Sequence, residues 1–125
     1  MRILLDTQVL FMAATGAQFS KRVQSLLASL DNDLLLSSVS ILEIALKHAR
    51  RKIDMPEAFV QQAIKDLGVT PIAFEPRHAY RLFTLPVHHA DPFDRMIVAT
   101  ALVEDVPLIG GDRQFAQYKG LRMIW

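Results

Sequence analysis

The sequence predicts an α/β fold, a single-domain α/β/α sandwich in which helices cover both faces of a central, mostly parallel sheet of about five strands. Short apolar runs alternate with helical patterns along all 125 residues, which is typical of parallel strands joined by crossover helices. Residues 3–5 and 34–36 are apolar at every position, as in strands buried on both faces. The helical stretch after Asp91 is apolar nearly all round, so it is expected to be buried. One domain over residues 1–125 is expected.

In the first half of the chain, apolar spacing and capping residues define the expected elements. Between the two apolar runs, residues 20–30 place apolar side chains at helical spacing. Serines follow the second run, and they are N-cap candidates for a helix that continues to about Arg51. Pro56 and Glu57 open another helix, which Gly68 ends.

The second half of the chain repeats the alternation with shorter elements. Residues 69–74 predict a third strand, and a short helix follows from Pro76. Asp91 and Pro92 form an N-cap and N1 pair that starts the long apolar helix. The last elements expected are a strand at residues 108–109, a short helix at residues 112–118 and a strand at residues 121–125.

Composition excludes several classes of protein. Fourteen Lys and Arg face thirteen Asp and Glu, so the chain is not a polycation that binds nucleic acid through bulk charge. Cysteine is absent, which excludes disulfides, thiol catalysis and cysteine zinc sites. No apolar stretch approaches the roughly 18 residues of a membrane span, and the N-terminus lacks the apolar run of a signal peptide. A soluble, cytoplasmic protein with no membrane partner is therefore expected.

Four carboxylates follow the predicted strands. Asp6 comes directly after the first strand, and Asp112 follows the fourth strand across two glycines. Glu43 lies early in the helix after the second strand, and Asp94 lies in the first turn of the apolar helix. Because the carboxyl ends of parallel strands share one edge of a sheet, we expect the four side chains to converge there.

Converging carboxylates need a counter-charge. Two of them about 4 Å apart repel by about 4 kcal/mol at an effective dielectric constant of about 20, so the group must take up protons or bind a cation. Hard oxygen ligands without cysteine favour Mg²⁺ or Mn²⁺ over Zn²⁺. A site of this kind suits the hydrolysis of phosphodiester bonds.

Each acid also has a purely structural interpretation, which for Asp94 is that of an acid favoured by the helix dipole. Asp6 and Asp112 could each cap the helix that follows. Glu43 completes a capping box with Ser40 and stands four residues before Lys47, the favourable order for an ion pair on a helix surface. Residue types alone leave these alternatives open.

Four segments come in the order and at the spacing of the motifs of a known family. They are residues 3–7, 37–47, 89–101 and 108–115, and the third, with Asp91-Pro92-Phe93-Asp94-Arg95 inside it, is the most specific. Through these segments nearly the whole chain resembles the PIN domain, in particular the small VapC-type ribonuclease toxins. The resemblance implies an α/β/α sandwich and metal-dependent cleavage of single-stranded RNA. It also implies an antitoxin protein as partner and a homodimer.

The resemblance also implies a role for individual residues. It makes Asp6, Glu43, Asp94 and Asp112 the catalytic quartet. Asp6, Asp94 and Asp112 are its expected ligands for Mg²⁺ or Mn²⁺. Supporting positions are Thr7, Asp91 and Arg95, of which Asp91 remains the expected helix cap and Thr7 and Arg95 also have structural interpretations.

One position departs from the family pattern. Relatives usually carry Ser or Thr two residues before the fourth acid, where this chain has Gly110. A hydroxyl that could contact bound water or phosphate is therefore missing.

Basic residues near the acids are candidates for holding RNA. Lys47, Arg50 and Arg51 are expected on one polar stripe together with Glu43. A solvated helix face with a basic C-terminal end explains the same pattern equally well.

Other functions are less well supported by the residues. A phosphatase of the haloacid dehalogenase type would carry a second Asp where this chain has Gln8. A receiver domain would need an acidic pair at the first strand and a phosphoacceptor Asp in mid-chain, and neither is evident. Two alternatives remain: an RNA-processing nuclease outside a toxin system, and a catalytically silent interaction module of the same fold.

Overall fold

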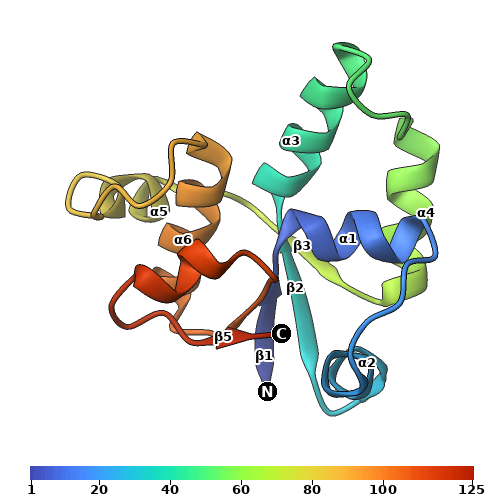
Figure 1. Cartoon of the computed structure of the whole chain (residues 1–125), viewed down its shortest axis with the longest axis horizontal. Coiled ribbons are helices and arrows are strands. Elements are labelled where there is room, and N and C mark those ends of the chain that lie inside the picture. The colour runs from blue at the N-terminus through green and yellow to red at the C-terminus, as the bar shows by residue number, and fades with distance from the viewer.

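Five strands form one sheet in the order β3-β2-β1-β4-β5 in the computed structural model, which describes residues 1–125 (Figure 1). The strands are β1 (Arg2–Leu5), β2 (Asp33–Ser37), β3 (Thr70–Ile72), β4 (Leu108–Ile109) and β5 (Met123–Ile124). Every neighbouring pair is parallel. The predicted sheet is thus confirmed in strand number and direction.

Helices cover both faces of the sheet. They are α1 (Thr7–Ala14), α2 (Lys21–Ala28), α3 (Ser38–Ala49), α4 (Glu57–Leu67), α5 (Pro76–Arg81) and α6 (Pro92–Glu104), with a 3₁₀ helix η1 (Arg113–Gln117). Figure 1 shows α1, α2 and α4 on one side of the sheet and α5 and α6 on the other. This is the predicted α/β/α sandwich. None of the helices combines the length and apolarity that a membrane span requires.

Two apolar clusters fill the spaces between the three layers. Successive side chains of a strand point to opposite faces. In β1, Ile3 and Leu5 accordingly join the cluster under α1, α2 and α4, while Leu4 joins the cluster under α6. These three side chains of the central strand are fully buried. The apolar run at residues 3–5 therefore serves both halves of the core, as expected of a central parallel strand.

The path of the chain determines where a site can form. From β1 the chain moves outward through β2 to β3, and it then crosses to the other side of β1 to form β4 and β5. In open α/β sheets, ligands bind at the carboxyl ends of the strands where the strand order reverses in this way. Asp6 follows β1 and Asp112 follows β4, so both lie at that point.

Several predicted helix ends differ from those in the structure. The cap of α3 is Ser37, whose side chain accepts a hydrogen bond from the N–H of Val39. The capping box predicted for Ser40 and Glu43 is therefore wrong. Helix α3 ends at Ala49, and Arg51 has a φ of 58°, so the predicted polar stripe does not reach Arg51. The predicted cap of α6 is confirmed: the Asp91 side chain accepts from the N–H of Phe93 at 2.8 Å.

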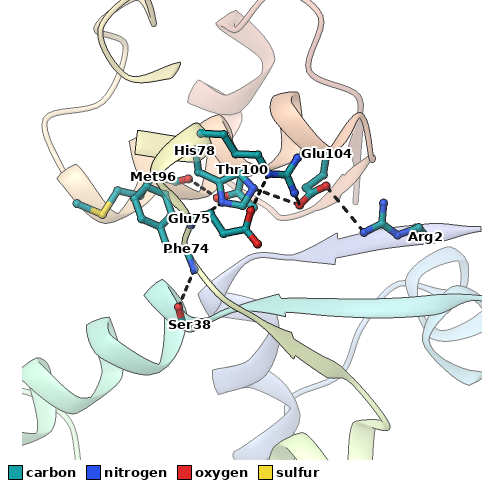
Figure 2. Close-up of polar contacts among 9 residues, drawn as sticks. Arg2, Ser38, Phe74, Glu75, His78, Met96, Thr100 and Glu104 are labelled. Atoms are coloured by element: carbon teal, nitrogen blue, oxygen red, sulfur yellow. Dashed lines mark hydrogen bonds and ion pairs between the residues drawn. The ribbon is translucent and has the colours of Figure 1, made fainter. Parts of the chain in front are cut away.

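A polar network fixes the segment between β3 and α6 (Figure 2). The Nδ1 atom of His78 accepts from the N–H of Glu75, and its Nε2 atom lies 3.2 Å from Glu104 at the end of α6. The Oγ atom of Ser38 accepts from the N–H of Phe74. Figure 2 shows how this last bond joins the start of α3 to the segment that follows β3. The network holds α3 and α6 in place, and these helices carry two of the acids.

Candidate active site

Asp6 is one of the two buried acids of the quartet, together with Glu43. It caps α1 by accepting a hydrogen bond from the N–H of Thr7 at 2.8 Å, and the residue is only 5% exposed. Burial, followed by the negative charge of Asp94, raises the pKa of Asp6 to about 7, with smaller contributions from Glu43 and Asp112. Asp6 is therefore both a helix cap and a member of the acidic site, because the charges of the other three acids raise the pKa of the carboxylate that caps α1.

Asp94 lies half-buried in the first turn of α6. Burial raises the pKa of its carboxyl group to about 6, and the neighbouring charge of Asp91 adds to the rise. Asp91 itself caps the helix and so faces the backbone of Phe93. Asp91 therefore contributes negative charge to the site while it holds the start of α6.

Asp112 follows β4 and caps η1, because its Oδ1 atom accepts from the N–H of Gln114 at 2.9 Å. Its Oδ2 atom lies 3.0 Å from Nε2 of His89. One ligand atom each from His89, Asp94 and Asp112 lies within 4.8 Å of the others. Asp6 is outside this group of three but is coupled to it through charge.

Glu43 extends from α3 into the same region. Its Oε2 atom accepts from Nζ of Lys47 at 2.6 Å, which confirms the predicted pair, but Glu43 is 5% exposed and so is not a surface residue. The hydrogen bond to Glu43 raises the pKa of Lys47. The Oε1 atom of Glu43 is buried without any hydrogen-bond partner. A buried carboxylate oxygen without a partner calls for a donor or a cation.

The donor set matches a hard divalent cation. Oxygen atoms of carboxylates are the ligands that Mg²⁺ and Mn²⁺ prefer, and no thiolate is available. The unpartnered Oε1 atom of Glu43 and the raised pKa values of Asp6 and Asp94 indicate that more negative charge gathers here than the one ion pair with Lys47 offsets. Asp94 and Asp112 lie close enough to share such an ion, and Asp6 stays a predicted ligand.

The supporting residues make structural contacts. The Oγ1 atom of Thr7 donates to Oγ of Ser40 at 2.8 Å, which ties α1 to α3. Nη2 of Arg95 donates to the carbonyl of Leu85 at 3.0 Å, and its Nε atom is buried without a partner. Both residues hold the elements that carry the acids. Arg95 has no hydrogen bond with a carboxylate of the quartet, and Thr7 has one only through its backbone N–H, which donates to Asp6.

Two hollows lie beside the acids. One, of about 280 Å³, is lined by Asp6, Glu43 and Lys47 together with the apolar side chains of Phe11 and Ile44. A second, of about 500 Å³, lies between the end of α3 and the start of α6. Its lining includes three basic residues, Lys47, Arg50 and Lys52.

Close packing explains the departure at Gly110. A Cβ atom there would lie 3.1 Å from both Cβ of Asp6 and Cε2 of Phe115, and 3.4 Å from Oδ2 of Asp6. A Ser or Thr would therefore displace Asp6 or the Phe115 ring. In this chain the end of β4 approaches Asp6 so closely that an added side chain would require Asp6 or Phe115 to shift by a few tenths of an ångström.

Two functional candidates escaped the sequence analysis, His89 and Tyr118. His89 belongs to the quoted motif at residues 89–101, but no ligand pattern marks it. Tyr118 is 29 residues further along, and its hydroxyl lies 2.9 Å from Nδ1 of His89. Such a contact depends on tertiary packing, so no sequence signal predicted it.

Comparison with known proteins identifies a family and several solved structures with this fold. The family model described as PIN domain matches residues 3–121. A comparison with curated proteins finds no match. Among solved structures, the VapBC2 complex of Rickettsia felis bound to a promoter DNA fragment contains a chain with a TM-score of 0.75 at 18% identity, covering 100% of this chain and 99% of that chain.

Two further solved structures have the same fold. One is the DNA-bound VapBC of Salmonella typhimurium, with a TM-score of 0.70, 15% identity and coverage of 99% of this chain and 97% of that chain. The other is a toxin–antitoxin complex from Klebsiella pneumoniae, with a TM-score of 0.63, 21% identity and coverage of 98% and 96%. At these identities the likeness establishes the fold over the full length of both chains.

Proposed function

The chain belongs to the PIN domain family, and on that premise we propose that it is a Mg²⁺- or Mn²⁺-dependent endoribonuclease that hydrolyses phosphodiester bonds in RNA. One observation carries the proposal: carboxylates from four separate segments lie together at the carboxyl edge of the sheet. Ligand atoms of Asp94 and Asp112 are within 4.8 Å of each other, and Asp6 and Glu43 line one hollow. The charges of Asp94, Glu43 and Asp112 all raise the pKa of Asp6. Isolated surface acids would not raise one another's pKa in this way.

In the proposed site, some residues bind the metal ion and others orient water or position the helices. Asp6, Asp94 and Asp112 would hold the ion, and a divalent cation bound there would supply positive charge for the phosphate and activate water. The carboxylate of Glu43, held by Lys47, would orient water beside the ion. Thr7 and Arg95 keep α1 and α6 in register around the acids.

RNA is proposed to approach along the end of α3. The acidic centre repels a polyanion, so positive side chains must hold the strand nearby. Lys47 and Arg50 line the hollow between α3 and the start of α6, and Lys52 joins them there. Arg51 is exposed just beyond the end of α3 and adds to the positive charge on this side.

Cleavage of single-stranded RNA with and without Mn²⁺ tests the proposal. We expect the purified wild-type protein to cleave RNA with Mn²⁺ or Mg²⁺ and to lose activity in EDTA. Asp6→Asn and Asp94→Asn should each lower the cleavage rate by at least about 100-fold, because each removes charge from the ion site. The matched control is Asp105→Asn, at an exposed acid beyond the far end of α6 with a left-handed backbone that Asn tolerates.

Several outcomes would contradict the proposal. Cleavage that resists EDTA, or that Asp6→Asn leaves unchanged, would mean a contaminant or a different mechanism. A wild-type protein that neither cleaves RNA nor gains thermal stability from millimolar Mn²⁺ would favour the catalytically silent interaction module.

We further propose that the nuclease acts as the toxin of a toxin–antitoxin pair in the cytoplasm. The solved structures quoted above are described as VapBC or toxin–antitoxin complexes, which supports an antitoxin protein as partner. Expression of the chain alone should arrest growth, and co-expression with the product of the adjacent small reading frame should relieve the arrest. Growth that is unaffected by expression of an active nuclease would favour ordinary RNA processing.

A homodimer is proposed as the form of the free protein. Sedimentation of the purified chain should give about twice the 14.1 kDa mass of one chain. A monomer at micromolar concentration would contradict this part of the proposal.

A further inference from the structure

We propose that His89 and Tyr118 form a hydrogen-bonded pair that positions the Asp112 carboxylate and thereby controls how tightly the acidic site holds a divalent cation. This inference rests on the function proposed above, and it adds two residues to the site. His89 acts through Asp112, so it is a positioning residue.

The imidazole of His89 lies between two partners. Its Nε2 atom is 3.0 Å from Oδ2 of Asp112, and its Nδ1 atom is 2.9 Å from the hydroxyl of Tyr118. His89 is 4% exposed and Tyr118 is 2% exposed. The two rings are nearly parallel, with an angle of 4° between them, and Phe115 packs against His89 at a centroid distance of 5.0 Å. The ring is therefore held in one orientation.

Hydrogen-bond chemistry assigns the proton on this ring. An ionised carboxylate only accepts hydrogen bonds, so the Nε2 atom of His89 must donate to Asp112. In the neutral ring Nδ1 is then the acceptor, and the Tyr118 hydroxyl is the donor that faces it. Both nitrogens are thus engaged, and neither is left to bind a cation, although His89 lies within 4.8 Å of Asp94 and Asp112.

Asp112 needs this support more than Asp6 does. It lies on a short turn after β4, and its side chain is 38% exposed, whereas Asp6 is held by burial. The N–H of Gln114 fixes Oδ1, and His89 fixes Oδ2. Two hydrogen bonds fix the plane of the carboxylate, and each oxygen keeps a lone pair for an ion.

Loss of such an outer partner has a typical cost. Hydrogen-bonded partners of metal ligands generally contribute about 10- to 100-fold in metal affinity. We therefore expect His89→Phe, which keeps an aromatic ring but removes the donor, to weaken Mn²⁺ binding by about 10- to 100-fold. Tyr118→Phe removes a single oxygen, and it should weaken binding by about threefold to tenfold because Nδ1 loses its donor and the ring can change tautomer.

Titration calorimetry with Mn²⁺ alone tests the inference without any need for activity. The wild type, His89→Phe, His89→Gln and Tyr118→Phe are compared, with unfolding curves in EDTA to confirm that each variant folds. His89→Gln should recover part of the lost affinity, since its amide can donate to Asp112, whereas a merely structural role would not be rescued by a donor. The matched control is Tyr80→Phe, at an exposed tyrosine.

The outcomes separate this inference from the proposed function. A wild type that binds no Mn²⁺ overturns both. If the wild type binds Mn²⁺, and folded His89→Phe and Tyr118→Phe bind it with the same affinity, the inference is overturned and the nuclease proposal is unaffected. Should His89→Phe fail to fold, Tyr118→Phe decides the question, because it keeps the buried ring.

Two spectroscopic measurements complete the test. Long-range ¹H–¹⁵N spectra of the ion-free protein should show a proton on Nε2 of His89, assigned by the loss of its signals in His89→Gln. Pulsed electron paramagnetic resonance of the Mn²⁺ complex should show no directly coordinated nitrogen. A ring without a proton on Nε2, or a nitrogen bound to Mn²⁺, would overturn the positioning role.

Discussion

Asp6 combines burial with three neighbouring carboxylates, so its ionised form is unfavourable in the folded protein. Its hydrogen bond from the N–H of Thr7 offsets only part of this cost, since the pKa still rises to about 7. A residue placed in this way gives up stability in the ion-free protein and gains it when a cation binds.

Replacing this carboxylate separates stability from ion binding. We expect Asp6→Asn to raise the free energy of unfolding by about 1–3 kcal/mol at pH 8 in EDTA, because the amide removes the charge and can still accept from Thr7. The same variant should lose the stabilisation that Mn²⁺ gives the wild type. Urea denaturation with and without Mn²⁺ measures both effects. Asp105→Asn should behave like the wild type, and an Asp6→Asn protein that is less stable than the wild type in EDTA would contradict the electrostatic argument.

At the scale of elements, the end of β4 is packed against the end of β1. Gly110 faces Asp6 and Phe115, and the next residue, Gly111, faces Trp125, whose Cε2 atom would lie 2.7 Å from an added Cβ. Two glycines in sequence therefore let η1 begin close to the sheet, and this brings Asp112 back toward the site.

A side chain at Gly110 should disturb this approach. We expect Gly110→Ala to lower the free energy of unfolding by about 1–3 kcal/mol, because the added Cβ must move Asp6 or the Phe115 ring. Gly110→Ser, which restores the hydroxyl usual in relatives, should be destabilised at least as much. Thermal unfolding in EDTA measures the effect. Variants as stable as the wild type would contradict the prediction, because Asp6 and Phe115 would then move aside without cost.

The end of α3 supplies the second prediction at this scale. Arg50 lines the hollow beside the start of α6, so Arg50→Gln should weaken the binding of single-stranded RNA and lower the slope of log affinity against log salt by about 0.7–1. Fluorescence anisotropy in EDTA over a series of salt concentrations measures both quantities. Lys65→Gln, at an exposed lysine on α4, is the control with equal charge loss. Equal slopes for Arg50→Gln and the wild type would mean that Arg50 does not contact RNA and that the basic end of α3 is only a solvated surface.

At the scale of the whole molecule, the acids at the carboxyl edge of the sheet make the folded protein less stable as the pH rises. The pKa values of Asp6 and Asp94 are raised to about 7 and about 6, well above the value of about 3.9 for Asp in unfolded chains. Between about pH 4 and pH 7 the folded state therefore binds more protons than the unfolded state. The contribution of these groups to the free energy of unfolding is greatest at low pH and is lost as the pH rises through 6 and 7.

Urea denaturation from pH 4 to pH 8 in EDTA checks this direction. The wild type should lose stability more steeply over this range than Asp6→Asn, by about 1–3 kcal/mol. Saturating Mn²⁺ should restore stability mainly above pH 6, where the carboxylates are ionised and can bind it. A wild-type protein whose stability changes with pH no more than that of Asp6→Asn would contradict the raised pKa of Asp6.

Much of the fold could be predicted because its signals are local. The apolar runs at residues 3–5 and 34–36 became the paired central strands β1 and β2, and the Asp91-Pro92 pair begins α6 as expected. Prediction failed where two local signals competed. Ser37 and Ser40 could both cap a helix, and the structure uses Ser37 as the cap while Ser40 bonds to Thr7.

The candidate site could be predicted in outline. Chain order alone placed Asp6 and Asp112 after strands that share one edge, because parallel strands end on the same side. The left-handed turn at Arg51 was not predictable from charge spacing, which assumed that the helix continued. The contact between His89 and Tyr118 was not predictable either, because it joins two loops that only the finished fold brings together.

The sequence by itself determined the order of strands and helices, the parallel sheet and the edge at which the acids lie, since each depends on apolar periodicity and on the rule that parallel strands end together. Only the tertiary structure decided the environment of each acid: burial of Asp6 and Glu43, the free oxygen of Glu43 and the support of Asp112 by His89. Burial and hydrogen bonding depend on which surfaces meet across the layers, and residues distant in the chain meet there only after folding.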